Sequence, residues 1–267
     1  MPMEVSMAIP WMRTGELRDL ASYPVWLRQI VADVRERRDA VAGHPLFRQM
    51  REAVLPARAT ASFFIRVWPV IDQFPQYMGR NLAKLGFGEP GHDLARAFLT
   101  RNVRVEQSHA DYWVAWAEAS AVPRDALLAG SAAAASAALS HWCWYVCDRG
   151  TLAEALAATN YAIEGVTGEW AQLVCSSDRY AASLPEEKRR AGMRWLRAHA
   201  RYDDGHPWEA LEIVAALLGA QPGPRDREAV HTAVRRSYDY MRITLDDCLA
   251  AEGELPAPAP VARERAA

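Results

Sequence analysis

Several features are scarce in this 267-residue sequence, and each scarcity removes a class of protein. Its 31 Lys and Arg residues nearly balance 33 Asp and Glu residues, so the chain has no basic field that would collect nucleic acid or anionic lipid. No uncharged apolar run reaches the length of a membrane span, and the N-terminus lacks the pattern of a secretory signal. We therefore expect a cytoplasmic protein that binds neither nucleic acid nor membrane.

Cysteine is also sparse. The four cysteines, at positions 143, 147, 175 and 248, are too few and too irregularly spaced for a disulfide framework, and they lack zinc-finger spacing. Cys143 and Cys147 lie four residues apart on an expected helix and so share one face. We interpret them as small buried apolar side chains. A nucleophilic thiol at one of these two positions is the alternative.

Strand patterns are missing as well, whereas apolar residues recur at spacings of three and four from Leu17 to about Leu249. This periodicity predicts an all-α helical bundle of about eight or nine helices. Turn signals separate the helices at residues 43–45, 86–91, 122–123, 150–151, 184–185 and 219–224. Thr151 and Ser183 precede helical segments as expected N-caps.

The chain is expected to form one domain over residues 1–253. Residues 254–267 alternate proline with alanine, which forbids a helix and offers no apolar face to bury, so a disordered tail is expected there.

The most specific chemical signal is a run of three metal-binding side chain types in residues 197–210. His199, Asp203 and His206 are spaced at i, i+4 and i+7, which would align them on one helix face. Apolar residues precede and follow them, so the face is expected to be buried. An imidazole–carboxylate–imidazole stripe is costly to bury unless a cation pairs with it, and a divalent metal is the usual partner. Gly205 and Pro207 flank His206 and should loosen the helix there.

Two further segments supply compatible ligands. Glu106 and His109 form a Glu-x-x-His pair among aromatic neighbours, which is the spacing of di-metal carboxylate sites. Glu164 lies among small and apolar residues, where a buried carboxylate needs a partner. Glu169 is the competing choice, but it is expected on a different face.

The combined set contains three histidines and three carboxylates from three expected helices. This mixture favours iron or manganese over zinc, which prefers thiolates in structural sites, and over calcium, which prefers oxygen alone. We predict a site for two iron ions (Fe2+/Fe3+), with manganese as an alternative, whose ligands are Glu106, His109, Glu164, His199, Asp203 and His206.

These residues resemble the haem-oxygenase-like diiron oxidases and oxygenases, a superfamily that shares its helical fold with thiaminase II and the pyrroloquinoline quinone synthase PqqC. The resemblance spans most of residues 25–250 and rests on the three ligand segments, together with the aromatic and proline pattern of residues 63–78. It implies that the protein activates dioxygen to oxidise a small amine, amino acid or fatty acid in a biosynthetic pathway, with an external reductant and as a homodimer. It also implies that Asp72 can supply an extra carboxylate.

Within the superfamily, the His-Asp-His stretch fits the branch of the chlamydial death-domain-associating protein, which makes para-aminobenzoate from its own tyrosine. That branch places its first Glu seven residues before the His, where this chain has Asn102, and it uses a lysine with no counterpart here. The Glu-x-x-His form is nearer to the fatty-acid decarboxylase of the superfamily. The alternatives are a self-sacrificing para-aminobenzoate synthase, a metal-free enzyme like thiaminase II or PqqC, and a non-catalytic helical interaction protein.

Overall fold

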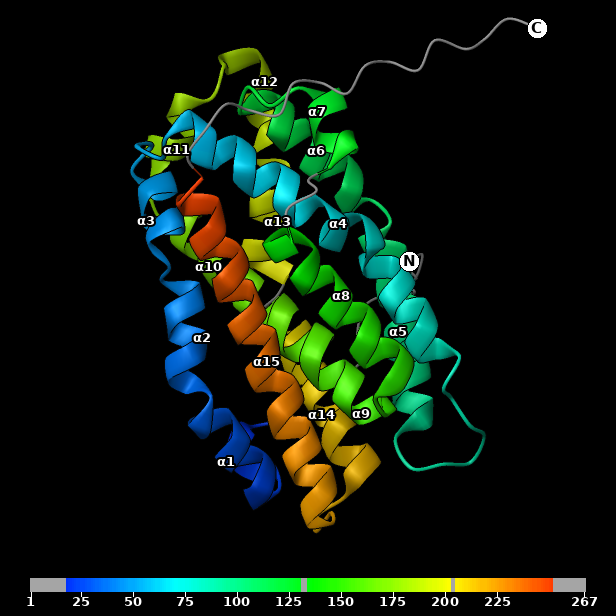
Figure 1. Ribbon diagram of the computed structural model, residues 1–267. Helices are drawn as coiled ribbons and strands as arrows, with labels where there is room; N and C mark the ends of the chain where they lie inside the picture. The colour runs from blue at the N-terminus through cyan, green and yellow to red at the C-terminus, as the bar shows by residue number, and fades with distance from the viewer. Residues whose placement is uncertain (1–17, 131–133, 203–204, 252–267) are drawn as a thin grey trace, which may run out of the picture.

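The computed structural model describes residues 18–130, 134–202 and 205–251, and within these ranges every regular element is a helix. The helices form an elongated bundle (Figure 1). Their bounds are η1 Leu20–Ser22, α1 Val25–Asp33, α2 Arg35–Ala42, α3 Pro45–Arg51, α4 Ala57–Leu82, α5 His92–Glu106, α6 His109–Ala119, α7 Arg124–Ala129, α8 Ala134–Arg149, α9 Leu152–Leu156, η2 Ala157–Ile163, α10 Glu164–Cys175, α11 Asp178–Ser183, α12 Glu186–Gly192, α13 Arg194–Tyr202, α14 His206–Leu218 and α15 Pro224–Leu249.

The middle of the bundle is one continuous helical stretch made of α9, η2 and α10. Thr151 begins it with the expected N-cap: the Thr151 hydroxyl accepts from the Glu154 backbone N–H, and the Glu154 carboxylate accepts from the Thr151 backbone N–H. All seven residues of η2 are buried, and η2 has π-helical geometry. Such π segments are rare and often lie at functional sites. Here the segment ends directly before Glu164.

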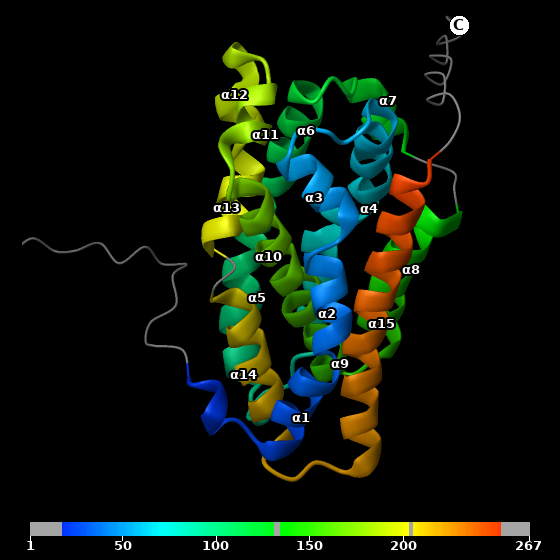
Figure 2. The ribbon, with the colours of Figure 1, turned by 90° about the vertical axis from the view of Figure 1, so that its left-hand side faces the viewer.

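Long helices enclose this central stretch. The helix α15 packs against η2, α8, α4 and α2, and Figure 2 shows α2 and α15 side by side along the bundle. On the side of the central stretch away from α15, α13 packs against α10 and α14 packs against η2. Buried apolar residues from all these helices form one continuous core. The described ligands of the three predicted segments therefore come from α5 and α6, from α10, and from α13 and α14, all of which contribute to this core.

The observed helices agree with the expected fold class and turn positions but are shorter and more numerous than expected. Each predicted turn lies between two observed helices, for example Gly43 between α2 and α3 and Pro123 before α7. The prediction for Ser183 was wrong, because Ser183 ends α11 and its hydroxyl donates to the Tyr180 carbonyl, while Pro185 is the N-cap of α12. Among the described helices, none is both long and apolar enough to cross a bilayer. The expected tail lies outside the described residues.

The segment that bears the His-x-x-x-Asp-x-x-His pattern is also divided. His199 lies in α13, which ends at Tyr202, and His206 is the first residue of α14. The prediction of one shared helix face was therefore wrong, whereas the expected interruption beside Gly205 and Pro207 is confirmed. The break lets each histidine approach the core from its own helix.

Close packing of α12 on α6 gives a direct test of the fold. A methyl group at Gly192 would lie 2.6 Å from the Ala119 Cβ, whereas a methyl group at Gly79, on the exposed side of α4, would contact nothing within 4 Å. We predict that Gly192→Ala lowers the free energy of unfolding by about 1–3 kcal/mol because of this overlap. The control Gly79→Ala should raise it by roughly 0.5–1 kcal/mol through helix propensity. Urea denaturation measures both, and equal effects would contradict the described packing.

Candidate metal centre

The first pair of candidate ligands lies where α5 gives way to α6. Glu106 is the last residue of α5 and His109 the first of α6, and both side chains are buried. The Nδ1 atom of His109 is 2.7 Å from the Oε2 atom of Glu106. The short break between the helices at Gln107 and Ser108 turns the two side chains toward each other.

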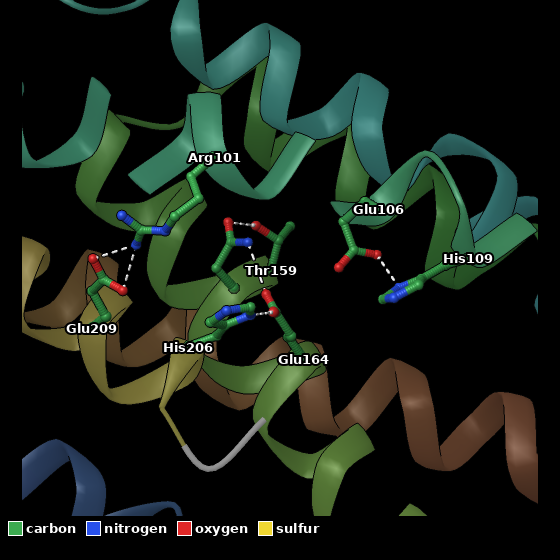
Figure 3. A network of polar contacts seen from close by, with 8 residues as sticks. Arg101, Glu106, His109, Thr159, Glu164, His206 and Glu209 are labelled. Atoms are coloured by element: carbon green, nitrogen blue, oxygen red, sulfur yellow. Dashed lines mark hydrogen bonds and ion pairs between the residues drawn. The ribbon is translucent and has the colours of Figure 1, made fainter. Parts of the chain in front are cut away.

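The second pair joins the central stretch to α14. Glu164 begins α10 directly after the π segment, and its Oε1 atom is 3.0 Å from the Nδ1 atom of His206. Its other oxygen accepts a hydrogen bond of 3.0 Å from the Asn160 amide, and the Thr159 hydroxyl donates in turn to the Asn160 carbonyl oxygen. Figure 3 shows Glu106 and Glu164 approaching from opposite sides of the same space.

His199 lies beside the first pair. It is 5% exposed, and its ring centroid is 4.5 Å from that of His109. Its Nδ1–H donates to the Trp195 carbonyl at 2.9 Å, which leaves Nε2 with a free lone pair. Hydrogen bonding of one imidazole nitrogen to a backbone carbonyl is the usual way to orient the other nitrogen toward a metal.

The five described candidate ligands lie close enough for their charges to shift the pKa values of one another. Burial alone would raise the pKa of Glu106, but His109, followed by His199 and His206, lowers it overall. Burial lowers the pKa of His109 and His206, yet the carboxylates of Glu106 and Glu164 raise both overall. Burial, followed by repulsion from His109, lowers the pKa of His199 to about 3. His199 is therefore a neutral imidazole at physiological pH, which is the form that binds metals.

Five of the six predicted ligands thus lie in one cluster, four of them buried and His206 half-buried, and Asp203 lies outside the described residues. Within the described ranges, no three His, Cys, Asp or Glu side chains converge on one point as a bound metal requires. Instead, the donors neutralise one another as the hydrogen-bonded pairs Glu106–His109 and Glu164–His206. The types of donor still fit iron, because carboxylates and neutral imidazoles are its usual ligands and are costly to bury without a cation.

Two other carboxylates are set apart from the cluster. Asp72 lies on the exposed side of α4, so the expectation that it supplies an extra ligand was wrong. Glu169, the competitor of Glu164, is bound by the guanidinium of Arg38 on a different side of α10. Their positions agree with the choice of Glu164 as the inward-facing carboxylate.

The structure adds supporting residues that the sequence analysis missed. Asn160 and Trp195 each lie four residues before a candidate ligand, on the same helical face, so this spacing was an available signal. A half-buried ion pair lies further out, where one nitrogen of Arg101 on α5 is 2.6 Å from both carboxylate oxygens of Glu209 on α14. No local spacing links Arg101 to Glu209, because they are 108 positions apart.

A narrow cavity opens onto the cluster, with about 60 Å³ available to the centre of a water-sized sphere. Its polar end contains Glu106, His109, Glu164 and His199, and the rest of its lining is apolar apart from two threonine hydroxyls. Among the described lining residues there is no lysine, arginine or tyrosine. The apolar lining residues are Phe47, Phe63, Val67, Val70, Ile71, Phe74, Leu139, Ile163, Trp170, Trp195, Met241 and Leu245.

A family model described as iron-containing redox enzyme matches residues 61–241, which include all six predicted ligands. This chain belongs to that family. The match and the helical fold confirm the resemblance to the haem-oxygenase-like superfamily.

Solved structures agree with this assignment. A TenA homologue from Pseudomonas syringae pv. tomato is 47% identical, with a TM-score of 0.85 over 89% of this chain and 98% of its own. A domain with a haem oxygenase-like fold from Shewanella denitrificans is 16% identical, with a TM-score of 0.66 over 87% of this chain and 93% of its own. A CADD-like protein from Nostoc punctiforme is 15% identical, with a TM-score of 0.58 over 83% and 97%. A search of curated proteins found no match.

The thiols of this family member are poorly suited to nucleophilic attack. Cys143 and Cys147 are both buried, and neither lines the cavity. Burial raises the pKa of both thiols, that of Cys147 to about 11. Since the thiolate is the nucleophile, both side chains would be protonated and unreactive at neutral pH. The interpretation of these cysteines as buried apolar side chains agrees with this environment.

If the cluster binds metal, anaerobic Fe(II) should stabilise the folded protein, because metal binds the folded state in preference to the unfolded chain. At about a hundredfold excess over Kd, we expect roughly 2.7 kcal/mol of stabilisation and a rise in Tm of roughly 5–10 °C. His199→Ala should abolish most of this rise, whereas the exposed His141→Ala on α8 should retain it. Differential scanning calorimetry gives both values, and an equal rise in the two variants would place the metal elsewhere.

Proposed function

We propose that the protein is a non-haem diiron oxidase or oxygenase that uses dioxygen to oxidise a fatty acid. The observation that supports this function best is the cavity, which combines one cluster of metal-binding side chains with an otherwise apolar lining. Ligand sites of this kind fix a substrate through a few polar groups and bury the remainder against apolar side chains. A fatty acid has the matching form, with one carboxylate and a slender apolar chain.

The shape of the cavity supports a chain-like substrate. Its wall on α4 includes residues from Phe63 to Phe74, which spans about 16 Å at the rise of an α-helix. The lining residues Val67, Val70, Ile71 and Phe74 follow the i, i+3, i+4, i+7 spacing of one helix face. An extended hydrocarbon chain can lie along such a wall and remove its apolar surface from water, which is favourable by about 25 cal/mol per Å².

The cavity lining disfavours the amine and amino-acid substrates. Free amino acids bear an ammonium and a carboxylate, and burying either without a partner is costly. The described lining offers carboxylates and imidazoles at one end only, and these are the proposed metal ligands. A fatty acid needs just one charged contact, which the bound metals would supply.

Two iron ions held by Glu106, His109, Glu164, His199, Asp203 and His206 would supply the redox chemistry of dioxygen. The protein's own part is to place and protect these ligands. The Asn160 amide fixes one oxygen of Glu164, and the Trp195 carbonyl fixes the ring of His199. The apolar walls exclude water from the reacting end of the substrate, which prevents side reactions.

The rival functions have less support from the site. A hydrolase like thiaminase II that uses Cys143 or Cys147 would need a thiolate in the cavity, and both thiols are buried outside its lining. Self-sacrificing para-aminobenzoate synthesis would consume a tyrosine, and although Tyr112 packs on the His109 ring with centroids 6.0 Å apart, no tyrosine is among the described residues that line the cavity. A non-catalytic interaction protein would have no use for a buried cluster of ionisable side chains, which is costly to fold.

The substrate class is tested by incubating the Fe(II)-loaded protein with dioxygen, a reductant and either straight-chain fatty acids or amino acids. We predict uptake of dioxygen that is coupled to loss of the fatty acid, measured with an oxygen electrode and by gas chromatography with mass spectrometry. His206→Ala should lower the rate by about a hundredfold or more, in the range typical of lost metal ligands and their supports, whereas His141→Ala should not change it. A chelator should abolish activity, and a thiol reagent should not.

Substitution in the cavity separates substrate fit from metal chemistry. Ile71→Trp should raise KM for longer acids by roughly tenfold, since it fills space that the chain would occupy. Leu94→Trp, on the exposed side of α5, is the matched control and should leave KM unchanged. Equal turnover of amino acids, or fatty-acid turnover that survives the chelator, would contradict the proposed function.

A further inference from the structure

A column of aromatic rings begins at the candidate metal centre. The indole of Trp195 stacks on the imidazole of His199 with ring centroids 3.7 Å apart and an angle of 25° between the planes. Trp116 stacks on Trp195 in turn, with ring centroids 5.4 Å apart and an interplanar angle of 21°. Both indoles are buried.

The column continues from Trp116 toward the edge of the bundle. The indole N–H of Trp116 donates a hydrogen bond of 2.7 Å to the phenolic oxygen of Tyr180 on α11. That oxygen also lies 3.0 Å from the hydroxyl of Ser120, which is half-buried at the end of α6. Tyr180 is 7% exposed, whereas Trp116 is completely buried. The series His199, Trp195, Trp116 and Tyr180 thus runs from the centre toward solvent without an aliphatic gap.

Dioxygen chemistry at the proposed centre creates a need for such a route. Reduction of dioxygen to two water molecules takes four electrons, and a two-electron oxidation of the substrate supplies only half of them. The other two must enter from outside. The cavity that reaches Glu106 and His199 is the one proposed to hold the substrate, so bound substrate would keep a reductant in solution out of it during turnover.

We propose that Trp195, Trp116 and Tyr180 form an electron relay between a one-electron donor at the protein surface and the metal centre, an inference that rests on the proposed function. Each transfer moves one electron inward: Trp195 gives an electron to the oxidised centre, Trp116 reduces Trp195, and Tyr180 reduces Trp116. Tyr180 passes its phenolic proton to the Ser120 hydroxyl, which gives up its own proton to solvent water at its partly exposed position, and Tyr180 regains a proton by the reverse path when the outside donor reduces the tyrosyl radical. Two such one-electron transfers supply the two electrons that the substrate does not provide.

The hydrogen bonds of the relay suit this sequence. Within the described residues, Nε1 of Trp195 has no hydrogen-bond partner. Oxidised Trp195 therefore has no base that would take its proton, and it remains a radical cation that is readily reduced again. Tyr180, in contrast, has a partner for its proton at the outer end. The electron is thus drawn inward while the proton stays near the surface.

Neighbouring rings provide a matched control. Trp113 also contacts Trp195, with centroids 5.0 Å apart, and it is equally buried. Its N–H donates to the backbone carbonyl of Phe64, and it has no hydrogen bond to an aromatic side chain near the surface. Trp113 also contacts Trp116, with centroids 5.1 Å apart, but it offers no hydrogen-bonded exit of its own toward the surface and lines no part of the cavity.

The relay is tested on the full chain after anaerobic Fe(II) loading and iron counting. Substrate-free protein is exposed to dioxygen, and radicals are followed by freeze-quench electron paramagnetic resonance. The oxidised centre is then reduced with ascorbate as the one-electron donor, in wild type, Trp116→Phe, Tyr180→Phe and Trp113→Phe. Circular dichroism checks the fold, and Tyr180→Phe keeps the relay testable if the buried Trp116→Phe variant fails to fold.

We expect a tyrosyl signal in wild type and in Trp113→Phe, and none in Trp116→Phe or Tyr180→Phe. Ascorbate should reduce the centre roughly tenfold or more slowly in the last two variants, and at the wild-type rate in Trp113→Phe. Equal rates in all four proteins would overturn the relay, as would the absence of bound iron, which would leave it without an acceptor. A radical pattern as expected, without fatty-acid turnover, would overturn the proposed substrate and retain the relay.

Discussion

Burial of ionisable side chains is the constraint on which the rest of this structure depends. Glu106, His109, Glu164 and His199 are each less than a tenth exposed, and carboxylates in such a place require a positive partner. The described residues meet this requirement in part, because imidazoles pair with the carboxylates. His199 is left neutral. Its Nδ1–H donates to the Trp195 carbonyl, and its Nε2 lone pair remains free. A cluster whose carboxylates are neutralised mainly by its own imidazoles is the arrangement that a divalent cation would complete.

The fold serves this cluster by bringing separate helix ends to one point. Glu106, His109 and His206 each lie at the first or last residue of a helix beside a break in the chain, where side chains can be turned inward, whereas Glu164 follows the π segment inside the continuous central stretch. The fully buried π segment η2 sets the direction of Glu164. Around these helices, α4 and α15 supply apolar walls, and the tryptophan column, whose inner member Trp195 lines the cavity, leads away from it toward Tyr180.

Much of this arrangement was predictable from sequence, and what was missed has physical causes. Periodicity predicted the helical class and the turns, since these depend on local spacing. The Glu106–His109 pair followed from an i, i+3 motif. The prediction that His199 and His206 share one helix face was wrong, because α13 ends at Tyr202 and a new helix, α14, begins at His206 between Gly205 and Pro207. The pairing of Arg101 with Glu209 and the Trp195–Trp116–Tyr180 series depend on tertiary contacts between distant positions, which no local pattern encodes.

The central claim is that the buried cluster binds two metal ions, and anomalous X-ray diffraction at the iron edge tests it most directly. Crystals loaded with Fe(II) under anaerobic conditions should give two anomalous peaks in the space between the Glu106–His109 and Glu164–His206 pairs. The hydrogen bonds within these pairs should be replaced by contacts to the metals. A single peak, no peak, or peaks outside this cluster would contradict the account.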